Sequence, residues 1–288
     1  MNPTIFQAMI LGLLQGATEF IPVSSSAHLI IAPWLFGWTD PALTSLPFDI
    51  ALHIGTLLAV LVYFWSDFVR LIRAWFASVR DRSIGPDPDR RLAWFIVVGT
   101  IPGAIFGFLL ESKIEALFHK PGVPIQPAAM IIMAGIIAAL GVLLLLADRL
   151  TAHRWDLRHM TWRQALLVGL AQALAVFPGV SRSGSTITAG LGLGLKREDA
   201  ARFSFLLSAP IIAGVGFKGL LEIYSGMKTG GIAHADVVLF PVGVITAAVA
   251  GYLCIRVLLR YLQSHPVDLF VYYRIALAVL IVVVALVR

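Results

Sequence analysis

Two short segments of this sequence place reactive side chains inside otherwise apolar stretches. The first contains Glu19, the serines of 24–26 and His28, and the second, 178–186, contains Arg182 among three serines and a threonine. A carboxylate can hold a metal ion or act as a base, a serine can act as a nucleophile, and an imidazole can transfer a proton. These residue types together favour phosphoryl transfer, which depends on positioning and charge neutralisation, often by a divalent cation.

The second segment favours an oxyanion site. Arg182 lies among Ser181, Ser183 and Thr186, and this polar cluster follows Pro178-Gly179 and opens a new apolar stretch. We therefore expect a helix to begin here, so that its unsatisfied N–H groups and the guanidinium fork are directed at one anion. A turn of small residues that allows close helix approach is the alternative interpretation.

Glu19 and Arg182 are expected to be partners. An ionisable side chain at the centre of a bilayer costs about 2.5–3.5 kcal/mol on insertion scales, so such residues are rarely retained without pairing or function. A purely structural ion pair is the alternative. His28 alone is a weak signal, and His53 in the following apolar segment is expected only to hydrogen-bond a backbone carbonyl.

The composition indicates an all-α polytopic membrane protein. The 288 residues are 59% hydrophobic and only 13% charged, with a mean hydropathy of +0.88, whereas soluble chains carry about 25% charged residues. The single cysteine, Cys254, excludes an intrachain disulfide and a cysteine metal site. The net charge of +6 does not indicate a nucleic-acid partner, because the basic residues gather in loops between apolar segments.

Six apolar segments are long enough to span a bilayer of lipids. They are residues 48–65, 92–110, 127–147, 203–223, 237–258 and 269–287. Two further stretches, 4–37 and 161–195, are each interrupted by a proline and a serine cluster. Irregular backbone at membrane depth is tolerated only where protein or a water-filled cavity surrounds it, so we predict two re-entrant helical hairpins.

This topology gathers the basic residues on one side. If both hairpins return to the side from which they enter, fifteen of the 22 lysines and arginines fall in four connections on that side, namely 66–91, 148–163, 196–202 and 256–268. The positive-inside rule makes this side cytoplasmic.

The two interrupted stretches also reveal an internal repeat. Residues 12–26 align with 169–183 at a constant offset of 157. We predict a first repeat, 1–150, and a second, 158–288, each with one hairpin and three spans. Three spans invert the second repeat relative to the first, so that the hairpin tips meet near the middle of the bilayer.

The motifs at 15–28 and 178–186 resemble the two signature motifs of the bacterial undecaprenyl-diphosphatase family, also called the bacitracin-resistance protein family. The resemblance extends over the whole chain. It implies hydrolysis of undecaprenyl diphosphate to the monophosphate and phosphate, which recycles the lipid carrier of peptidoglycan synthesis. It also implies a divalent metal, Mg²⁺ or Ca²⁺, and a bacterial inner-membrane protein whose active site is reached from the periplasm.

The resemblance further implies roles for individual residues. Glu19 would hold the metal or act as a base, Ser25 would be the nucleophile, His28 an acid, a base or a phosphate contact, and Arg182 a clamp on the diphosphate. Substrate contacts would come from Gln15, Ser24, Ser26, Ser181, Ser183 and Thr186. Because Gln15 is an uncharged amide, diphosphate oxygens and waters must supply most of the metal ligands. Attack by Ser25 and attack by an activated water both remain open.

Other classes of function fit the same pattern. An inverted repeat with polar tips is also transporter architecture, so a lipid-phosphate flippase is the main alternative, and a lipid-binding scaffold is a third. The glycines of 99–107 allow a homodimer, although they can equally serve packing within one chain.

Overall fold

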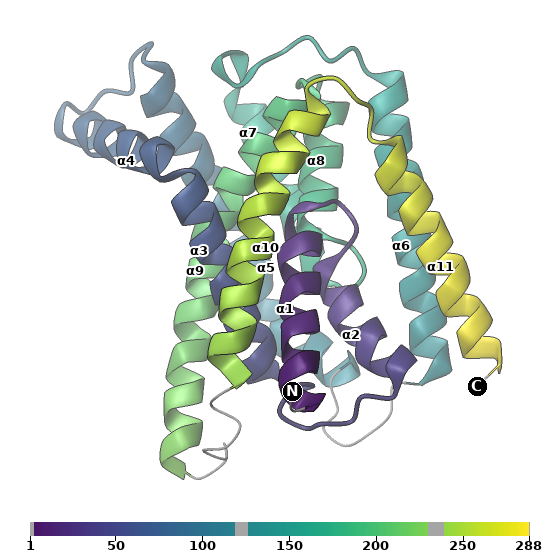
Figure 1. Ribbon diagram of the computed structural model, residues 1–288. Coiled ribbons are helices and arrows are strands. Elements are labelled where there is room, and N and C mark those ends of the chain that lie inside the picture. Colours follow the sequence, from purple (N-terminus) through teal and green to yellow (C-terminus); the bar gives the residue numbers. More distant parts are fainter. Residues whose placement is uncertain (1–2, 119–125, 230–238, 288) are drawn as a thin grey trace.

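The computed structural model describes residues 3–118, 126–229 and 239–287, and these residues fold into eleven α-helices and two short 3₁₀ turns. The helices of both halves of the described chain form one bundle (Figure 1). The predicted all-α class is confirmed.

Six helices are long and apolar enough to cross a membrane. They are α3 (Leu46–Tyr63), α5 (Pro88–Phe118), α6 (Pro127–Leu150), α9 (Arg197–Thr229), α10 (Leu239–Leu262) and α11 (Asp268–Val287). Each contains nearly all of one predicted span, which makes the chain a multi-pass membrane protein. Helices α5 and α9 continue beyond the predicted ends of their spans, because hydropathy marks the apolar part of a helix and not its terminus.

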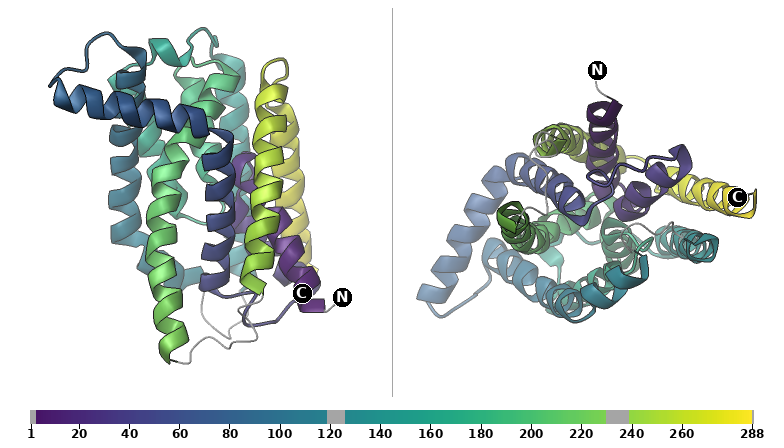
Figure 2. Two further views of the ribbon diagram at one scale, coloured as in Figure 1. Left: turned by 60° about the vertical axis from the view of Figure 1, so that its left-hand side comes forward. Right: turned by 90° about the horizontal axis from the view of Figure 1, so that it is seen from below.

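The first basic connection, 66–91, contains a helix. Residues Trp65–Arg80 form helix α4, which lies across one end of the bundle (Figure 2). Leu71 and Ser78 are buried, and the Ser78 hydroxyl accepts a hydrogen bond of 2.8 Å from the indole N–H of Trp94. The opposite face of α4 exposes Ile72 and Phe76. A helix with one buried and one exposed apolar side at the end of the spans is suited to the membrane interface.

Two interrupted helix pairs lie within the bundle. The first consists of α1 (Pro3–Phe20) and α2 (Ser25–Phe36), and the second of α7 (Trp162–Ala173) and α8 (Arg182–Gly192), with a 3₁₀ turn, η2 (Leu174–Val176), between them. Helix α1 packs against α10, and α7 packs against α5. These contacts bring the two breaks together in the interior of the bundle.

Close approach of glycines sets this packing. A Cβ atom added to Gly12 of α1 would lie 2.7 Å from the carbonyl oxygen of Gly243 in α10, and one added to Gly169 of α7 would lie 2.4 Å from that of Gly99 in α5. Gly103 likewise faces Gln172 within the chain. Of the glycines considered for a homodimer, Gly99 and Gly103 therefore serve packing within one chain, whereas a Cβ added to Gly107 would meet nothing within 4 Å.

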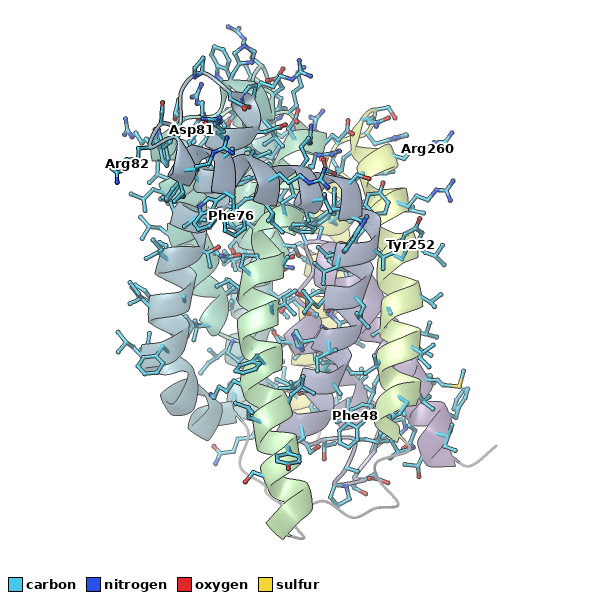
Figure 3. The ribbon with its side chains drawn as sticks, turned by 90° about the vertical axis from the view of Figure 1, so that its left-hand side faces the viewer. Phe48, Phe76, Asp81, Arg82, Tyr252 and Arg260 are labelled. Carbon is cyan, nitrogen blue, oxygen red and sulfur yellow. The ribbon has the colours of Figure 1, made fainter. Side chains whose placement is uncertain are left out.

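All four basic connections lie at one end of the bundle, as the sequence predicts. Arg202 forms an ion pair of 2.7 Å with Asp67, and the backbone N–H of Lys196 donates to the carbonyl of Trp155 at 2.8 Å. Figure 3 shows Arg82 and Arg260 at this end and Phe48 at the other. We call it the basic end.

Candidate active site

Each helix break ends on a serine in the left-handed region. Ser24 has φ 77° and Ser181 has φ 70°, and the two positions differ by the offset of the sequence repeat. Each serine hydroxyl caps the helix that follows, Ser24 accepting from the N–H of Ala27 at 3.4 Å and Ser181 from that of Gly184 at 3.0 Å. Residues other than glycine avoid this backbone conformation. Two such serines at equivalent positions therefore indicate that the surrounding structure holds each tip.

Glu19 is the centre of the site. Its carboxylate is 5% exposed, and its Oε1 lies 3.0 Å from Nη2 of Arg182, on the other tip. Its Oε2 accepts hydrogen bonds from the Ser25 hydroxyl at 2.6 Å and from the Gln15 side-chain amide at 3.0 Å. The predicted pairing of Glu19 with Arg182 is confirmed, and one carboxylate contacts both a hydroxyl and a guanidinium.

Arg182 keeps one donor free. Its Nη1 donates to the carbonyl of Ser204 in α9 at 3.1 Å, and its Nη2 is bound to Glu19. The Nε–H is buried and has no partner among the described atoms. A buried donor without a partner is costly, so an acceptor brought by a ligand would be bound favourably here.

A second arginine contacts the backbone of both tips. Arg274 of α11 is fully buried, and its guanidinium donates to the carbonyls of Ile137 at 2.9 Å, Pro22 at 2.8 Å and Gly179 at 3.3 Å. Pro22 and Gly179 are equivalent in the repeat. Sequence reasoning gave Arg274 no role, although its position inside an apolar segment was a signal.

Of the other residues predicted to contact the substrate, some lie at the helix breaks and others support the helices that follow the breaks. Ser183 donates to the carbonyl of Ile21 on the opposite tip at 3.1 Å, and Ser26 lies 3.3 Å from the hydroxyl of Ser24. Thr186 is fully buried, and its hydroxyl lies 2.6 Å from that of Ser204. Thr186 therefore supports the first turn of α8 from inside.

The chain matches the family model of the bacitracin resistance protein BacA over residues 8–280. The chain belongs to the BacA family. It is 47% identical over 286 residues to an undecaprenyl-diphosphatase of Thermomicrobium roseum, covering 99% of each chain. It is 46% identical over 281 residues to one of Moorella thermoacetica, covering 98% of each. It is also 42% identical over 288 residues to one of Desulforudis audaxviator, covering both chains completely.

In this BacA-family chain, both ring nitrogens of His28 have partners other than Glu19. Its Nδ1 lies 2.7 Å from the carbonyl oxygen of Ser24, and its Nε2 lies 2.7 Å from the hydroxyl of Tyr273. The two rings are stacked with centroids 5.7 Å apart. Both ring nitrogens are thus engaged in the described structure, and a role of His28 in proton transfer would require one of these bonds to open.

His53 contributes a second imidazole that the sequence analysis gave no part in the site. Its Nδ1 lies 2.7 Å from the carbonyl oxygen of Asp49, which confirms the backbone contact. Its Nε2 lies 3.7 Å from Oε2 of Glu19, and its side chain is 28% exposed. The spacing of His53 from the motif that contains Glu19 does not indicate this contact, because α3 approaches Glu19 only in the tertiary fold.

The BacA-family site offers few charged ligands for a metal. Among the described residues no group of three or more histidines, cysteines or carboxylates could hold one. The side-chain amide nitrogen of Gln15 donates to Glu19, and its side-chain oxygen is buried and has no partner. One carboxylate and neutral oxygens suit a hard cation such as Mg²⁺, which keeps several water or phosphate ligands.

Proposed function

We propose that this chain hydrolyses the anhydride bond of undecaprenyl diphosphate, releases inorganic phosphate and returns undecaprenyl phosphate to cell-wall synthesis. Loss of this substrate from the membrane would confer bacitracin resistance. The observation that carries the proposal is the simultaneous contact of Glu19 with Ser25 and Arg182 across two helix tips. The names of the relatives support the same reaction.

Glu19 is placed to receive a proton. The Ser25 hydroxyl already donates to Oε2 of Glu19 at 2.6 Å, so the same oxygen can accept that proton as a P–O bond forms to the terminal phosphorus. The bridging oxygen then leaves with the lipid phosphate. Water hydrolyses the phosphoserine in a second step, or attacks directly when it takes the place of Ser25 beside Glu19.

Arg182 and the helix starts would hold the diphosphate. The free Nε–H of Arg182 and the first N–H groups of α2 and α8 supply donors for phosphate oxygens. Ser24, Ser26, Ser181 and Ser183 order this backbone through caps and short contacts. The cradle neutralises charge that moves to the leaving phosphate, which is the main requirement of phosphoryl transfer.

A divalent cation, Mg²⁺ or Ca²⁺, would be held by Glu19, with the Ser25 hydroxyl and the unpartnered side-chain oxygen of Gln15 as candidate neutral ligands. Such an ion neutralises charge on the diphosphate. The other ligands would be diphosphate oxygens and water.

We further infer that the chain is an inverted repeat of residues 1–150 and 158–288, with α1–α2 and α7–α8 as re-entrant hairpins. Support comes from the equivalent caps at Ser24 and Ser181 and from the exchanged packing of α1 on α10 and α7 on α5. By the positive-inside rule the basic end faces the cytoplasm of a bacterial inner membrane, and the site would open toward the periplasm.

A phosphate-release assay on a prenyl diphosphate tests the proposed reaction. We expect wild-type protein with Mg²⁺ or Ca²⁺ to release phosphate, and chelator to stop the release. Glu19→Ala and Arg182→Ala should each lower turnover by roughly a thousandfold or more, whereas Arg260→Ala, at the basic end, should retain it. Wild-type turnover in both site variants would refute the enzyme. Movement of lipid phosphate across sealed liposomes without phosphate release would indicate the transporter instead.

A further inference from the structure

A cleft lies at the basic end, where α7 begins and α8 ends, and therefore at the ends of these helices that are far from their break. It has a volume of about 870 Å³ and is lined by residues of the α6–α7 connection, the start of α7 and the end of α8, among them Arg154, Trp155, Arg163 and Leu167. Figure 1 shows this connection at the same end as α4. No residue of the candidate active site lines the cleft.

Backbone hydrogen bonds fix the floor of the cleft. The N–H groups of Arg154 and Trp155 both donate to the carbonyl of Gly194 at 3.0 Å. The Gln164 side chain donates to the carbonyl of Leu193 at 3.0 Å and thereby joins the start of α7 to the end of α8. The cleft is therefore a shaped surface and not the side of a loose loop.

The cleft carries uncompensated positive charge. Arg154 and Arg163 are exposed, and neither guanidinium has a partner among the described residues. His159, also in the lining, lies 2.7 Å from Asp156. No carboxylate belongs to the described lining. Arg197 nearby is neutralised by buried Asp148, whereas no described carboxylate pairs with either arginine of the cleft. Two unpaired guanidinium groups in one lining favour an anionic ligand.

An apolar stripe begins at the cleft. Leu166, Leu167, Leu170 and Leu174 are all exposed, and their spacing places them on one side of α7 and η2. Trp155 at the cleft is 49% exposed, which is typical of the membrane interface. A charged head beside a continuous apolar surface matches an amphipathic ligand and does not match a free anion or a nucleic acid.

We propose that this cleft binds the phosphate headgroup of an anionic phospholipid from the leaflet at the basic end. Arg154 and Arg163 contact the phosphate, and one acyl chain lies along the leucines of α7. Basic clefts between membrane helices on the cytoplasmic side commonly bind such headgroups. Because α7 and α8 also carry Arg182, the lipid would stabilise the helix pair that holds half of the active site, but the proposal does not depend on the phosphatase reaction.

Lipid retention by purified full-length protein tests this site. Native mass spectrometry should show phosphatidylglycerol bound to the wild type more tightly than phosphatidylcholine. The double variant Arg154→Gln/Arg163→Gln should weaken phosphatidylglycerol binding by roughly 10- to 30-fold. The matched control Arg256→Gln/Arg260→Gln removes two exposed basic residues from the same end and should retain binding.

Two further measurements complete the test. Phosphatidylglycerol should raise the unfolding temperature of the wild type and the control, but not of the double variant, whose lipid-free unfolding temperature should equal that of the wild type. Substitution of both Leu166 and Leu170 by serine should weaken lipid binding as well. Equal lipid binding by the double variant and the control, or complete competition by millimolar inorganic phosphate, would overturn the proposal.

Discussion

At the scale of single residues, the site depends on one carboxylate that binds a guanidinium through one oxygen and a serine hydroxyl through the other. Oε1 of Glu19 is bound to Arg182, while Oε2 accepts from Ser25. Arg182 lowers the cost of keeping Glu19 ionised in the bundle, and an ionised Glu19 can accept a proton from Ser25. Removal of either member of a buried pair leaves an uncompensated charge and costs about 3–5 kcal/mol, so the same contact is required for stability and for chemistry.

The sequence could predict this pair but not the direction of every side chain. Glu19 and Arg182 are rare charges in apolar surroundings, and that rarity is visible without a structure. His28 was predicted as an acid, a base or a phosphate contact, and its Nε2 lies beside the hydroxyl of Tyr273, which is 245 positions away in the chain. Such a partner is chosen by tertiary packing, and neither spacing nor residue type records it.

His53 provides a test at this scale. Its Nε2 is 3.7 Å from Glu19, beyond a normal hydrogen bond, so it can move toward either Glu19 or a bound phosphate. We expect His53→Gln to lower kcat by about tenfold or more in the phosphate-release assay. The unfolding temperature should change little, because the side chain is partly exposed.

The exposed His265, near the α10–α11 connection, supplies the control. His265→Gln should leave turnover unchanged. Wild-type kcat in His53→Gln would show that this imidazole has only its backbone contact to Asp49.

At the scale of helices, the breaks are held by more than their own sequence. Pro22 and the capping serines explain why the helices stop and restart, and this much follows from the motifs. The positions of the tips depend on Arg274, which reaches both of them from α11. The sequence located the arginine in its span but could not say which backbone carbonyls it would meet. The ends of α5 and α9 could not be predicted either, because polar residues continue those helices beyond the apolar span.

Substitution of Arg274 separates positioning from catalysis. Arg274→Lys keeps the charge but cannot match three carbonyls with one compact ammonium group. Unsatisfied buried carbonyls cost about 1–3 kcal/mol each, so we expect the unfolding temperature to fall by roughly 5 °C or more. Because the tips would move apart, kcat should fall while KM changes much less.

Arg256→Lys, an exposed substitution of the same chemistry on α10, should alter neither quantity. A variant Arg274→Lys with wild-type kcat and unfolding temperature would contradict the positioning role.

Helix contact through glycine gives a second prediction at this scale. A Cβ at Gly169 would lie 2.4 Å from a backbone oxygen of Gly99, whereas a Cβ at Gly135 of α6 would meet nothing within 4 Å. Backbone cannot move aside as a side chain can, so Gly169→Ala should destabilise the protein by about 1–3 kcal/mol. Gly135→Ala should be neutral or stabilise by about 0.5–1 kcal/mol. Thermal unfolding of the two variants in the same detergent measures the difference, and equal unfolding temperatures would contradict the close contact.

At the scale of the whole molecule, charge and hydropathy specify more than any single motif. The six spans and the gathering of the basic connections at one end follow from where apolar runs and arginines alternate, and the bundle has this arrangement. Helix α4 was not predicted, because the spans were sought as long apolar runs and this segment is too polar to be one, although its apolar residues follow a helical period. The assembly of two distant tips into one site requires the complete bundle, since α10, α5 and α11 all hold them.

Orientation in the membrane can be tested on the intact chain. With Cys254→Ser as background, Thr44→Cys and Ser83→Cys each place one thiol at an exposed position, on either side of the span α3. If the positive-inside rule holds, a membrane-impermeant maleimide added to intact spheroplasts should label Thr44→Cys and leave Ser83→Cys unlabelled until the membrane is permeabilised. The reverse pattern would place the basic end outside and the active site toward the cytoplasm. Labelling of both variants in intact cells would contradict α3 as a span, because the two thiols would then lie on one side of the bilayer.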